Sequence, residues 1–341
     1  MSGMHELRKP YLLLVGETDN PLSAKTAFGL KDWVPESCVG QLRFTNRAVD
    51  VGLTELSLCE AVARGAKTLV IGIAPPGGQL PASWHATLID ALEAGLDIAA
   101  GLHQRLNEIP EVARCAGRLG RQIHDVRHCD TTFPVGTGAR RPGRRLLTVG
   151  TDCVVGKKYT ALAIAKGMQS RGHKADFRAT GQTGILISGR GVAVDAVAAD
   201  FLSGAAEALS PANAPDHWDV IEGQGSLFHP AYAAVTLGLL HGSQPDALVL
   251  CHDVARKFLH AFGSFPIVSL EEAIPAYLSA ARLTNPNARF VGVALNTSCL
   301  SEAQAKELLA GTAQRLALPC VDPIRTGIAP LVDALESFNA G

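Results

Sequence analysis

Residues 146–160 (LLTVGTDCVVGKKYT) join a short apolar strand, a glycine-bounded loop and a helix that begins with lysine. Gly150 and Gly156 enclose five residues, and Lys157 follows directly. In this order, the loop N–H groups and the helix N-terminus surround a phosphate, and the lysine adds positive charge. The phosphate-loop pattern has Ser or Thr after Gly-Lys as a magnesium ligand, whereas this chain has Lys158. The stretch predicts phosphate binding and leaves a role for magnesium open.

Further polar residues extend the predicted phosphate site. Thr160 follows one helical turn after Gly156 and offers a hydroxyl that could replace the missing Ser or Thr. Asn296 ends an expected strand at 290–295, where a carboxamide can pair with a base edge such as that of adenine. The predicted cofactor-binding residues are Thr151, Asp152, Cys153, Val155, Gly156, Lys157, Lys158, Tyr159, Thr160 and Asn296.

A polar, glycine-rich segment follows the expected strand at 175–178. The segment Ala179–Gly184 (ATGQTG) carries hydrogen-bonding side chains on Thr180, Gln182 and Thr183. Ordinary turns seldom combine two glycines with three such side chains, so a second pocket for an anion or substrate is favoured over a long turn. This pocket would lie at the carboxyl end of its strand, where open parallel sheets bind ligands.

The next expected helix, Val192–Ser210, carries the acidic residues Asp195, Asp200 and Glu207. Asp195 and Asp200 are five residues apart, so they point about 140° apart and cannot act as a paired-carboxylate site. One of them could face the pocket, and the alternative is a solvated or capping acid.

Glu222 follows the expected strand at 218–221 and precedes two glycines in the string IEGQG. A carboxylate at this strand end, facing a phosphate loop, can hold magnesium, orient a water or act as a base. A capping role is the alternative. His229 lies just beyond, and histidine is the side chain most often used for proton transfer near neutral pH. Glu222 and His229 are therefore the candidate catalytic residues.

The rest of the chain alternates strand-like and helix-like patterns, which predicts βαβ units and parallel sheets. At 341 residues the length favours about two domains. We expect two doubly wound α/β domains, a Rossmann-like one at 1–135 and a P-loop NTPase-like one at 136–341. In the first domain we expect helices at 23–30, 54–64 (capped by Thr54), 84–94 and 106–117. The stretch 130–145, rich in Gly, Pro and Arg, is interpreted as a solvated basic connection.

Composition excludes several functional classes. Net charge is −1, which gives no nucleic-acid or membrane field, and no apolar run approaches the roughly 20 residues of a membrane span. The N-terminus has no apolar signal core, and the eight cysteines form no CxxC motif, so a reduced cytoplasm is expected. His124, His128 and Cys129 lack a fourth ligand, and no metal site is expected there.

These motifs resemble two groups of known proteins. The loop GTDCVVGKK, the string IEGQGS and the strand GVALN resemble the dethiobiotin synthetase-like P-loop proteins, in which an asparagine at the position of Asn296 binds adenine. Lys158 departs from their pattern and puts ATP hydrolysis in doubt. A resemblance over nearly the whole chain is to a two-domain family, long of unknown function, whose members include D-glutamate N-acetyltransferase. The strings that carry it are GTDC, GKK, ATGQTGILISG, VDAVAADFLSGAAE, IEGQGSLFHP, GGQLP, GLDIAAGLH and HDVR.

The resemblance implies acetyl transfer from acetyl-CoA to an acidic amino acid, with D-glutamate as the expected acceptor. Glu222 or His229 would be the base, and N–H groups near Gly223–Gly225 would stabilise the oxyanion. The expected acceptor-binding residues are Arg178, Thr180, Gln182, Thr183 and Asp195. An ATP-dependent ligase or kinase of the dethiobiotin synthetase type is the alternative, and a nucleotide-sensing module is a third. We expect a homo-oligomer with a small-molecule amino-acid substrate and no nucleic-acid or membrane partner.

Overall fold

The structure is a computed structural model that describes residues 5–21, 23–74, 78–128 and 132–338. Cys129 and the beginning of the predicted connection lie outside these ranges. The chain forms two compact units, one made of Met1–Thr131 with Gly181–Ala196 and one made of Thr132–Thr180 with Val197–Gly341. The segment 181–196 thus joins the N-terminal unit, although the predicted boundary assigns it to the C-terminal domain.

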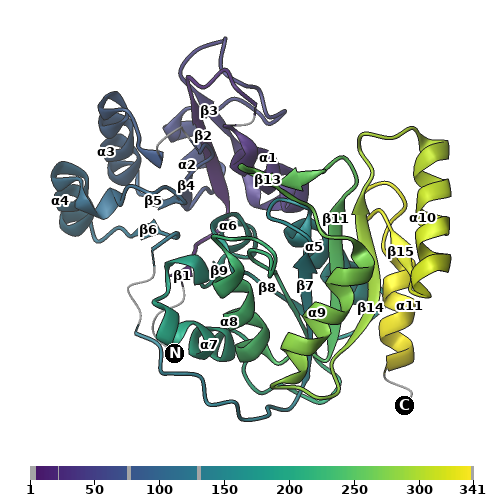
Figure 1. Cartoon of the computed structure of the whole chain (residues 1–341). Coiled ribbons are helices and arrows are strands. Elements are labelled where there is room, and N and C mark those ends of the chain that lie inside the picture. The colour runs from purple at the N-terminus through teal and green to yellow at the C-terminus, as the bar shows by residue number, and fades with distance from the viewer. Residues whose placement is uncertain (1–4, 22, 75–77, 129–131, 339–341) are drawn as a thin grey trace. The chain divides into compact units, whose positions relative to one another are not determined.

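The N-terminal unit is built on a five-stranded parallel sheet with the order β3-β2-β4-β5-β6 (Figure 1). The strands β2, β4 and β5 in the middle of the sheet are buried throughout, as expected where helices cover both faces. The chain runs from β2 to β3 on one side and then returns to β4 on the other, so β2 and β4 flank the topological switch point. The strands are β2 (Tyr11–Gly16), β3 (Cys38–Arg43), β4 (Thr68–Ile71), β5 (Asp97–Ala100) and β6 (Ile123–Asp125).

Short helices connect these strands. Ser57, rather than the expected Thr54, caps α2, because Ser57 and Glu60 form a reciprocal capping box. The expected helix at 106–117 begins later, at Pro110, since proline suits the first helical position. The α-helices are α1 (Lys25–Trp33), α2 (Leu58–Ala63), α3 (His85–Glu93), α4 (Pro110–Leu119) and α6 (Gln182–Ser188). The 3₁₀ helices are η1 (Pro35–Ser37), η3 (Ala82–Trp84), η4 (Leu106–Glu108) and η5 (Val194–Ala196).

The segment 181–196 is fixed to the N-terminal unit at two places. Helix α6 packs against α1, and β9 (Arg190–Gly191) pairs antiparallel with β1 (His5–Glu6). The predicted polar loop therefore turns into helix α6 at Gln182. The expected helix 192–210 is interrupted, because the backbone at Ala198 is extended (ψ 140°) between η5 and α7. Asp195 and Asp200 consequently belong to different units.

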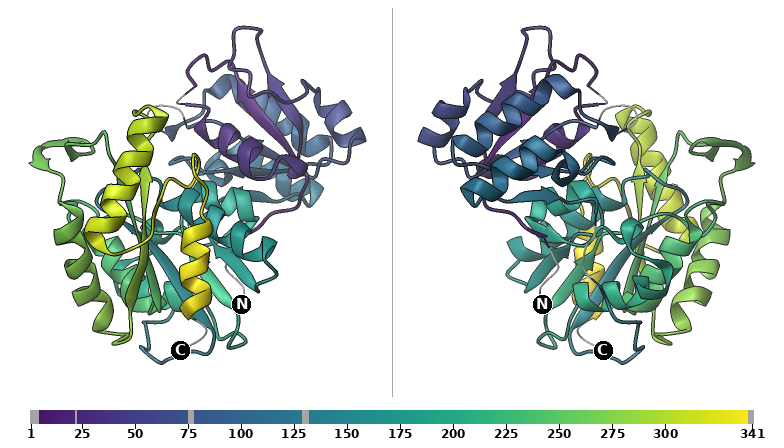
Figure 2. Two further views of the ribbon diagram at one scale, coloured as in Figure 1. Left: turned by 90° about the vertical axis from the view of Figure 1, so that its right-hand side faces the viewer. Right: turned by 90° about the vertical axis from the view of Figure 1, so that its left-hand side faces the viewer.

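The C-terminal unit contains a six-stranded parallel sheet with the order β15-β14-β11-β7-β10-β8. Figure 2 shows helices on both faces of this sheet, with α5 and α11 in contact on one face and α7, α8 and α9 on the other. The strands are β7 (Arg144–Gly150), β8 (Ala175–Arg178), β10 (Trp218–Ile221), β11 (Ala247–Asp253), β14 (Arg289–Asn296) and β15 (Cys320–Val321). A hairpin follows β11, with strands β12 (Phe258–Leu259) and β13 (Phe262–Pro266).

The core of this unit is apolar and lies where α5 and α11 pack on the strands. Ile164 and Met168 from α5 meet Val220 and Val249 from the sheet, all nearly inaccessible to solvent. The helices are α5 (Lys157–Ser170), α7 (Ala199–Leu209), α8 (Ala233–Ser243), α9 (Leu270–Arg282), α10 (Glu302–Leu316) and α11 (Ala329–Phe338). Two parallel-sheet α/β domains are thus confirmed. In the described ranges, no helix has the length and apolar character needed to cross a bilayer.

The arginine-rich stretch is exposed over residues 134–140, as a solvated connection would be, but its last residue, Arg145, lies in β7 and is buried. The guanidinium of Arg145 is 2% exposed and donates hydrogen bonds to Ser210 Oγ (2.9 Å) and to the carbonyl oxygens of Arg141 and Pro211. Burial lowers the pKa of Arg145 to about 10. Arg145 therefore fixes the stretch to the C-terminal unit.

Candidate active site

The phosphate loop connects β7 to α5, and its backbone includes left-handed conformations that glycine favours. Gly156 caps α5 with a φ of 102°, and Val154 also adopts a left-handed conformation with a φ of 56°. A Cβ on Gly150 would lie 2.7 Å from Val155 Cγ2. Tyr277 on α9 anchors the loop by donating to the Gly150 carbonyl oxygen at 2.7 Å. The strand, loop and helix of the predicted phosphate site are therefore present in the required order.

Lys157 lies inside this loop. Its side chain is almost completely buried, and Nζ donates to the carbonyl oxygen of Asp152 at 2.8 Å. Burial lowers the pKa of Lys157, and the nearby acidic groups of Cys153, Cys251, Asp152 and Glu222 oppose this effect. An ammonium has three protons, so Lys157 can donate to a bound phosphate and keep its bond to the loop.

The carboxylate of Asp152 ties the loop to the segment after β11. It accepts hydrogen bonds from the Cys153 N–H (2.6 Å), from Arg256 Nη1 (2.7 Å) and from the His260 N–H (2.7 Å). Asp152 was expected among the cofactor ligands, but three internal donors already occupy its oxygens. Asp152 and Arg256 therefore hold the loop in shape, and no sequence motif indicated Arg256.

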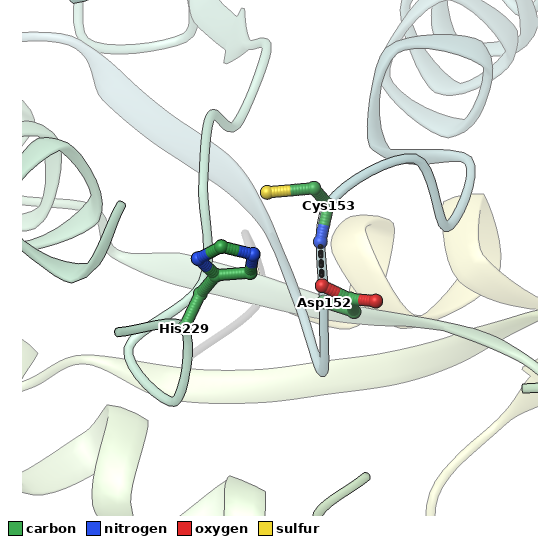
Figure 3. Close-up of side chains that lie close together, drawn as sticks. All are labelled: Asp152, Cys153 and His229. Carbon is green, nitrogen blue, oxygen red and sulfur yellow. Dashed lines mark hydrogen bonds between the residues drawn. The ribbon is translucent and has the colours of Figure 1, made fainter. Parts of the chain in front are cut away.

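His229 approaches the phosphate loop from the segment between β10 and α8. One of its ring nitrogens, the Cys153 sulfur and one Asp152 carboxylate oxygen lie within 4.8 Å of one another (Figure 3). His229 is 1% exposed, stacks on Tyr232 with ring centroids 4.6 Å apart, and meets the edge of Phe262. The structure thus brings together one predicted catalytic residue and two predicted loop residues.

The hydrogen bonds of His229 define its tautomer. The Ala231 N–H donates to Nδ1 at 3.2 Å, so the neutral ring carries its proton on Nε2, which faces the His260 carbonyl oxygen at 3.4 Å. Nδ1 and the Asp152 carboxylate are thus both engaged, which disfavours a metal ion among these three side chains. Burial raises the pKa of the Cys153 thiol, so Cys153 is poorly suited to act as a thiolate.

Glu222 is placed at the end of β10 and is buried (3% exposed). Its Oε2 accepts a hydrogen bond from the Thr180 N–H at 3.0 Å, and its carbonyl oxygen accepts one from Thr180 Oγ1 at 2.6 Å. The residue after Glu222 must be glycine, because a Cβ on Gly223 would lie 1.7 Å from the Thr148 carbonyl oxygen. The Gly223 N–H, expected to help stabilise an oxyanion, already donates to Thr148 Oγ1 at 3.0 Å.

Arg178 was expected to bind an acceptor carboxylate, and the structure gives it an internal partner. Its guanidinium contacts Asp219 Oδ1 at 2.7 and 2.8 Å, and the Asp219 side chain is 2% exposed. Asp219 lies within β10, two residues before its carboxyl end, and its carboxylate also accepts a hydrogen bond from Ser210 Oγ at 2.6 Å. We therefore treat Arg178 as a structural residue.

A cavity of about 340 Å³ lies beside the phosphate loop in the C-terminal unit. Tyr159 and Thr160 form one wall, and Asn296, Asp322 and Ile324 form the other. Asn296 lines this cavity, and its carboxamide oxygen accepts a hydrogen bond from the Ser298 N–H at 3.1 Å.

Other predicted cofactor residues take internal roles. Thr151 Oγ1 contacts His252 Nδ1 at 2.9 Å, and Thr160 Oγ1 donates to the Gly156 carbonyl oxygen at 3.0 Å. Burial lowers the pKa of His252. Lys158 is half-buried, with its ammonium 5.0 Å from the centre of the Tyr159 ring.

The remaining predicted acceptor residues lie in the N-terminal unit. Gln182 and Thr183 line a cavity of about 530 Å³, together with Lys25, His103 and Arg127. Asp195 forms an ion pair with Arg127 at 3.2 Å. The predicted acceptor residues are therefore divided between the units, with Arg178 and Thr180 in the C-terminal unit and Gln182, Thr183 and Asp195 in the N-terminal unit.

The fold and the phosphate site define a two-domain α/β protein with a Rossmann-like N-terminal domain and a P-loop C-terminal domain. The chain belongs to the DUF1611 family. The family's Rossmann-like domain of unknown function matches residues 42–129, and its P-loop domain of unknown function matches residues 134–332.

Individual relatives agree with this assignment. A D-glutamate N-acetyltransferase from Tritonibacter scottomollicae is 49% identical, over 97% of this chain and 99% of that protein. A D-glutamate N-acetyltransferase from a Pseudoalteromonas species is 48% identical, over 96% of this chain and 98% of that protein. The crystal structure of a DUF1611 family protein from Anabaena variabilis ATCC 29413 is 35% identical and superposes with a TM-score of 0.83, covering 97% of this chain and 100% of that one.

Proposed function

We propose that the protein is an N-acetyltransferase that moves acetyl from acetyl-CoA to the amino group of D-glutamate. The observation that carries this proposal is the similarity over nearly the whole chain to two proteins named D-glutamate N-acetyltransferase, at 49% and 48% identity. Identity at this level over both domains supports the same type of reaction.

The phosphate loop supports CoA as the carrier of the acetyl group. CoA has a pyrophosphate and a further phosphate on its ribose, and the loop offers N–H groups, a helix N-terminus and Lys157 to such anions. Lys158 replaces the hydroxyl that would bind magnesium. Binding without phosphoryl transfer does not require that ligand, so acyl transfer from CoA fits this loop better than ATP cleavage does.

Acetyl transfer requires a base and a proton donor. The amino group must be neutral to attack the thioester carbon, the new C–N bond forms, and the C–S bond breaks to release the CoA thiolate. Glu222, a buried carboxylate, is the proposed base for the amine proton. His229 carries its proton on Nε2, so we assign it the role of donor to the carbonyl oxygen or the leaving thiolate.

The test is thiol release from acetyl-CoA with a panel of D- and L-amino acids, with and without magnesium. The expected result is thiol release with D-glutamate that persists without magnesium, together with N-acetyl-D-glutamate detected by mass spectrometry. Absence of thiol release with every acceptor, alongside magnesium-dependent ADP formation from ATP, would replace this proposal with a ligase or kinase of the dethiobiotin synthetase type.

A further inference from the structure

The cavity of the N-terminal unit lies at the carboxyl ends of its parallel strands. Lys25 and Thr26 follow β2, His103 follows β5, and Arg127 follows β6. Open parallel sheets bind ligands at these ends, near the switch point that β2 and β4 flank here. The position therefore marks a ligand site that belongs to this unit alone.

Glycines allow the walls of this cavity to approach each other. A Cβ on Gly101 would lie 2.9 Å from Gln182 Cγ, and a Cβ on Gly78 would lie 2.4 Å from the His103 ring. Gly78 also has a φ of 67°, which disfavours other residues. These two positions explain why the strings around residues 78 and 101 carry glycine.

The lining is rich in groups that bind carboxylates. Lys25 and Arg127 contribute positive charge, and Thr26, Gln182 and Thr183 contribute hydrogen-bond donors. Among the residues that the structure describes, the Lys25 ammonium has no ion-pair partner. Helix α1 begins at Lys25 without a side-chain cap, so its positive end adds to the attraction for anions.

One acidic group completes the arrangement. Asp195 lies 3.2 Å from Arg127, and its side chain remains about one-third exposed (34%). Two cations with one nearby carboxylate complement a ligand with two carboxylates and one ammonium. The absence of a dinucleotide fingerprint in the sequence after β2 (GETDN) argues against a dinucleotide.

We propose that this cavity binds an acidic amino acid, with Arg127 and Lys25 on its carboxylates and Asp195 on its ammonium. The choice of D-glutamate rests on the proposed function, and the same chemistry would suit an effector.

Calorimetric titration of the full-length protein with D-glutamate tests the binding without relying on catalysis. We expect Arg127→Met to weaken D-glutamate binding by about tenfold or more, as the loss of a charge-assisted hydrogen bond does. Arg64→Met is the matched control, because Arg64 is exposed at the C-terminal end of α2, away from the cavity lining. Unchanged D-glutamate affinity in Arg127→Met, with wild-type affinity measurable, would overturn the proposal.

The Asp195→Asn variant tests whether Asp195 binds the ammonium group of the ligand. It should weaken D-glutamate binding but leave glutarate, which lacks the ammonium, bound equally or more tightly. Equal weakening of both ligands would contradict the assignment of Asp195. If the wild-type protein binds D-glutamate but releases no thiol from acetyl-CoA, the catalytic proposal fails while the cavity proposal holds.

Discussion

The backbone N–H of Thr180 donates a hydrogen bond to the buried Glu222 carboxylate at 3.0 Å, and the Thr180 hydroxyl donates to the Glu222 carbonyl oxygen. Two neighbouring strands, β8 and β10, thus fix one carboxylate at their shared carboxyl end. One carboxylate oxygen is oriented by this bond, as a positioned base requires.

Glu222→Gln is expected to lower kcat by about 100-fold or more, the usual effect of losing a general base. Glutamine keeps an oxygen that can accept the Thr180 N–H, so the midpoint of thermal unfolding should change little. Steady-state kinetics at saturating acetyl-CoA measure the effect. A variant with wild-type kcat would exclude Glu222 as the base.

His229→Ala is expected to lower kcat by about 100-fold, because the proposed Nε2–H donor is lost. His229→Gln should retain more activity, since its amide N–H can occupy a position near that of Nε2–H. The comparison of kcat for the two variants is the measurement. Equal loss in both would show that packing against Tyr232 and Phe262, rather than the donated proton, is what matters.

The sequence was sufficient to predict the sheets and the phosphate loop, because glycines, a lysine and apolar strands are local signals. It also marked Glu222 and His229, which follow the same strand. The sequence could not show which ligand-binding segments share a unit. Gln182 follows a strand of the C-terminal unit by a few residues, yet its helix packs against α1 of the other unit.

The internal partners of charged residues were also beyond prediction from the sequence. Arg178 and Asp152 were predicted to bind ligands because of their charge. In the folded protein, Arg178 forms an ion pair with Asp219, and Asp152 forms one with Arg256. Such pairs are set by strand register and by loops far apart in the chain. Tyr277, which anchors the Gly150 carbonyl oxygen, lies within a helix and has no local motif.

Asp322 holds one wall of the cavity beside the phosphate loop. Burial acts to raise its pKa, but hydrogen bonds from Thr297, Arg325 and Ile324 outweigh burial, so the pKa is lowered. A carboxylate with a lowered pKa stabilises the fold above the unfolded-state pKa, and this stability is lost as pH falls through the folded-state pKa.

Asp322→Asn should therefore destabilise the protein by about 1–3 kcal/mol at neutral pH, because an amide N–H₂ would face backbone donors. Denaturant unfolding at neutral and acidic pH measures this, and the difference between the variant and the wild type should shrink on acidification. A difference that is independent of pH would contradict the proposed stabilisation by the ionised carboxylate. The KM for acetyl-CoA should also rise, since Asp322 lines the cavity.

Lys157→Met is expected to weaken CoA binding by about tenfold or more, because the loop loses its buried charge-assisted donor to phosphate. Methionine has nearly the length of the lysine side chain, and the midpoint of thermal unfolding checks that the fold is kept. Calorimetric titration with CoA measures the affinity, and Lys166→Met on the exposed side of α5 is the control. Unchanged CoA affinity in Lys157→Met would rule out the proposed phosphate site.

The same titration over a range of pH tests the charge state of Lys157. The ammonium is the form that attracts phosphate, so CoA affinity should hold below the Lys157 pKa and fall as pH rises through it. Because burial lowers this pKa, the fall should begin at a lower pH than for an exposed lysine. Lys157→Met should abolish this part of the pH dependence, whereas Lys166→Met should leave it intact. An identical pH profile in Lys157→Met and the wild type would show that another group sets it.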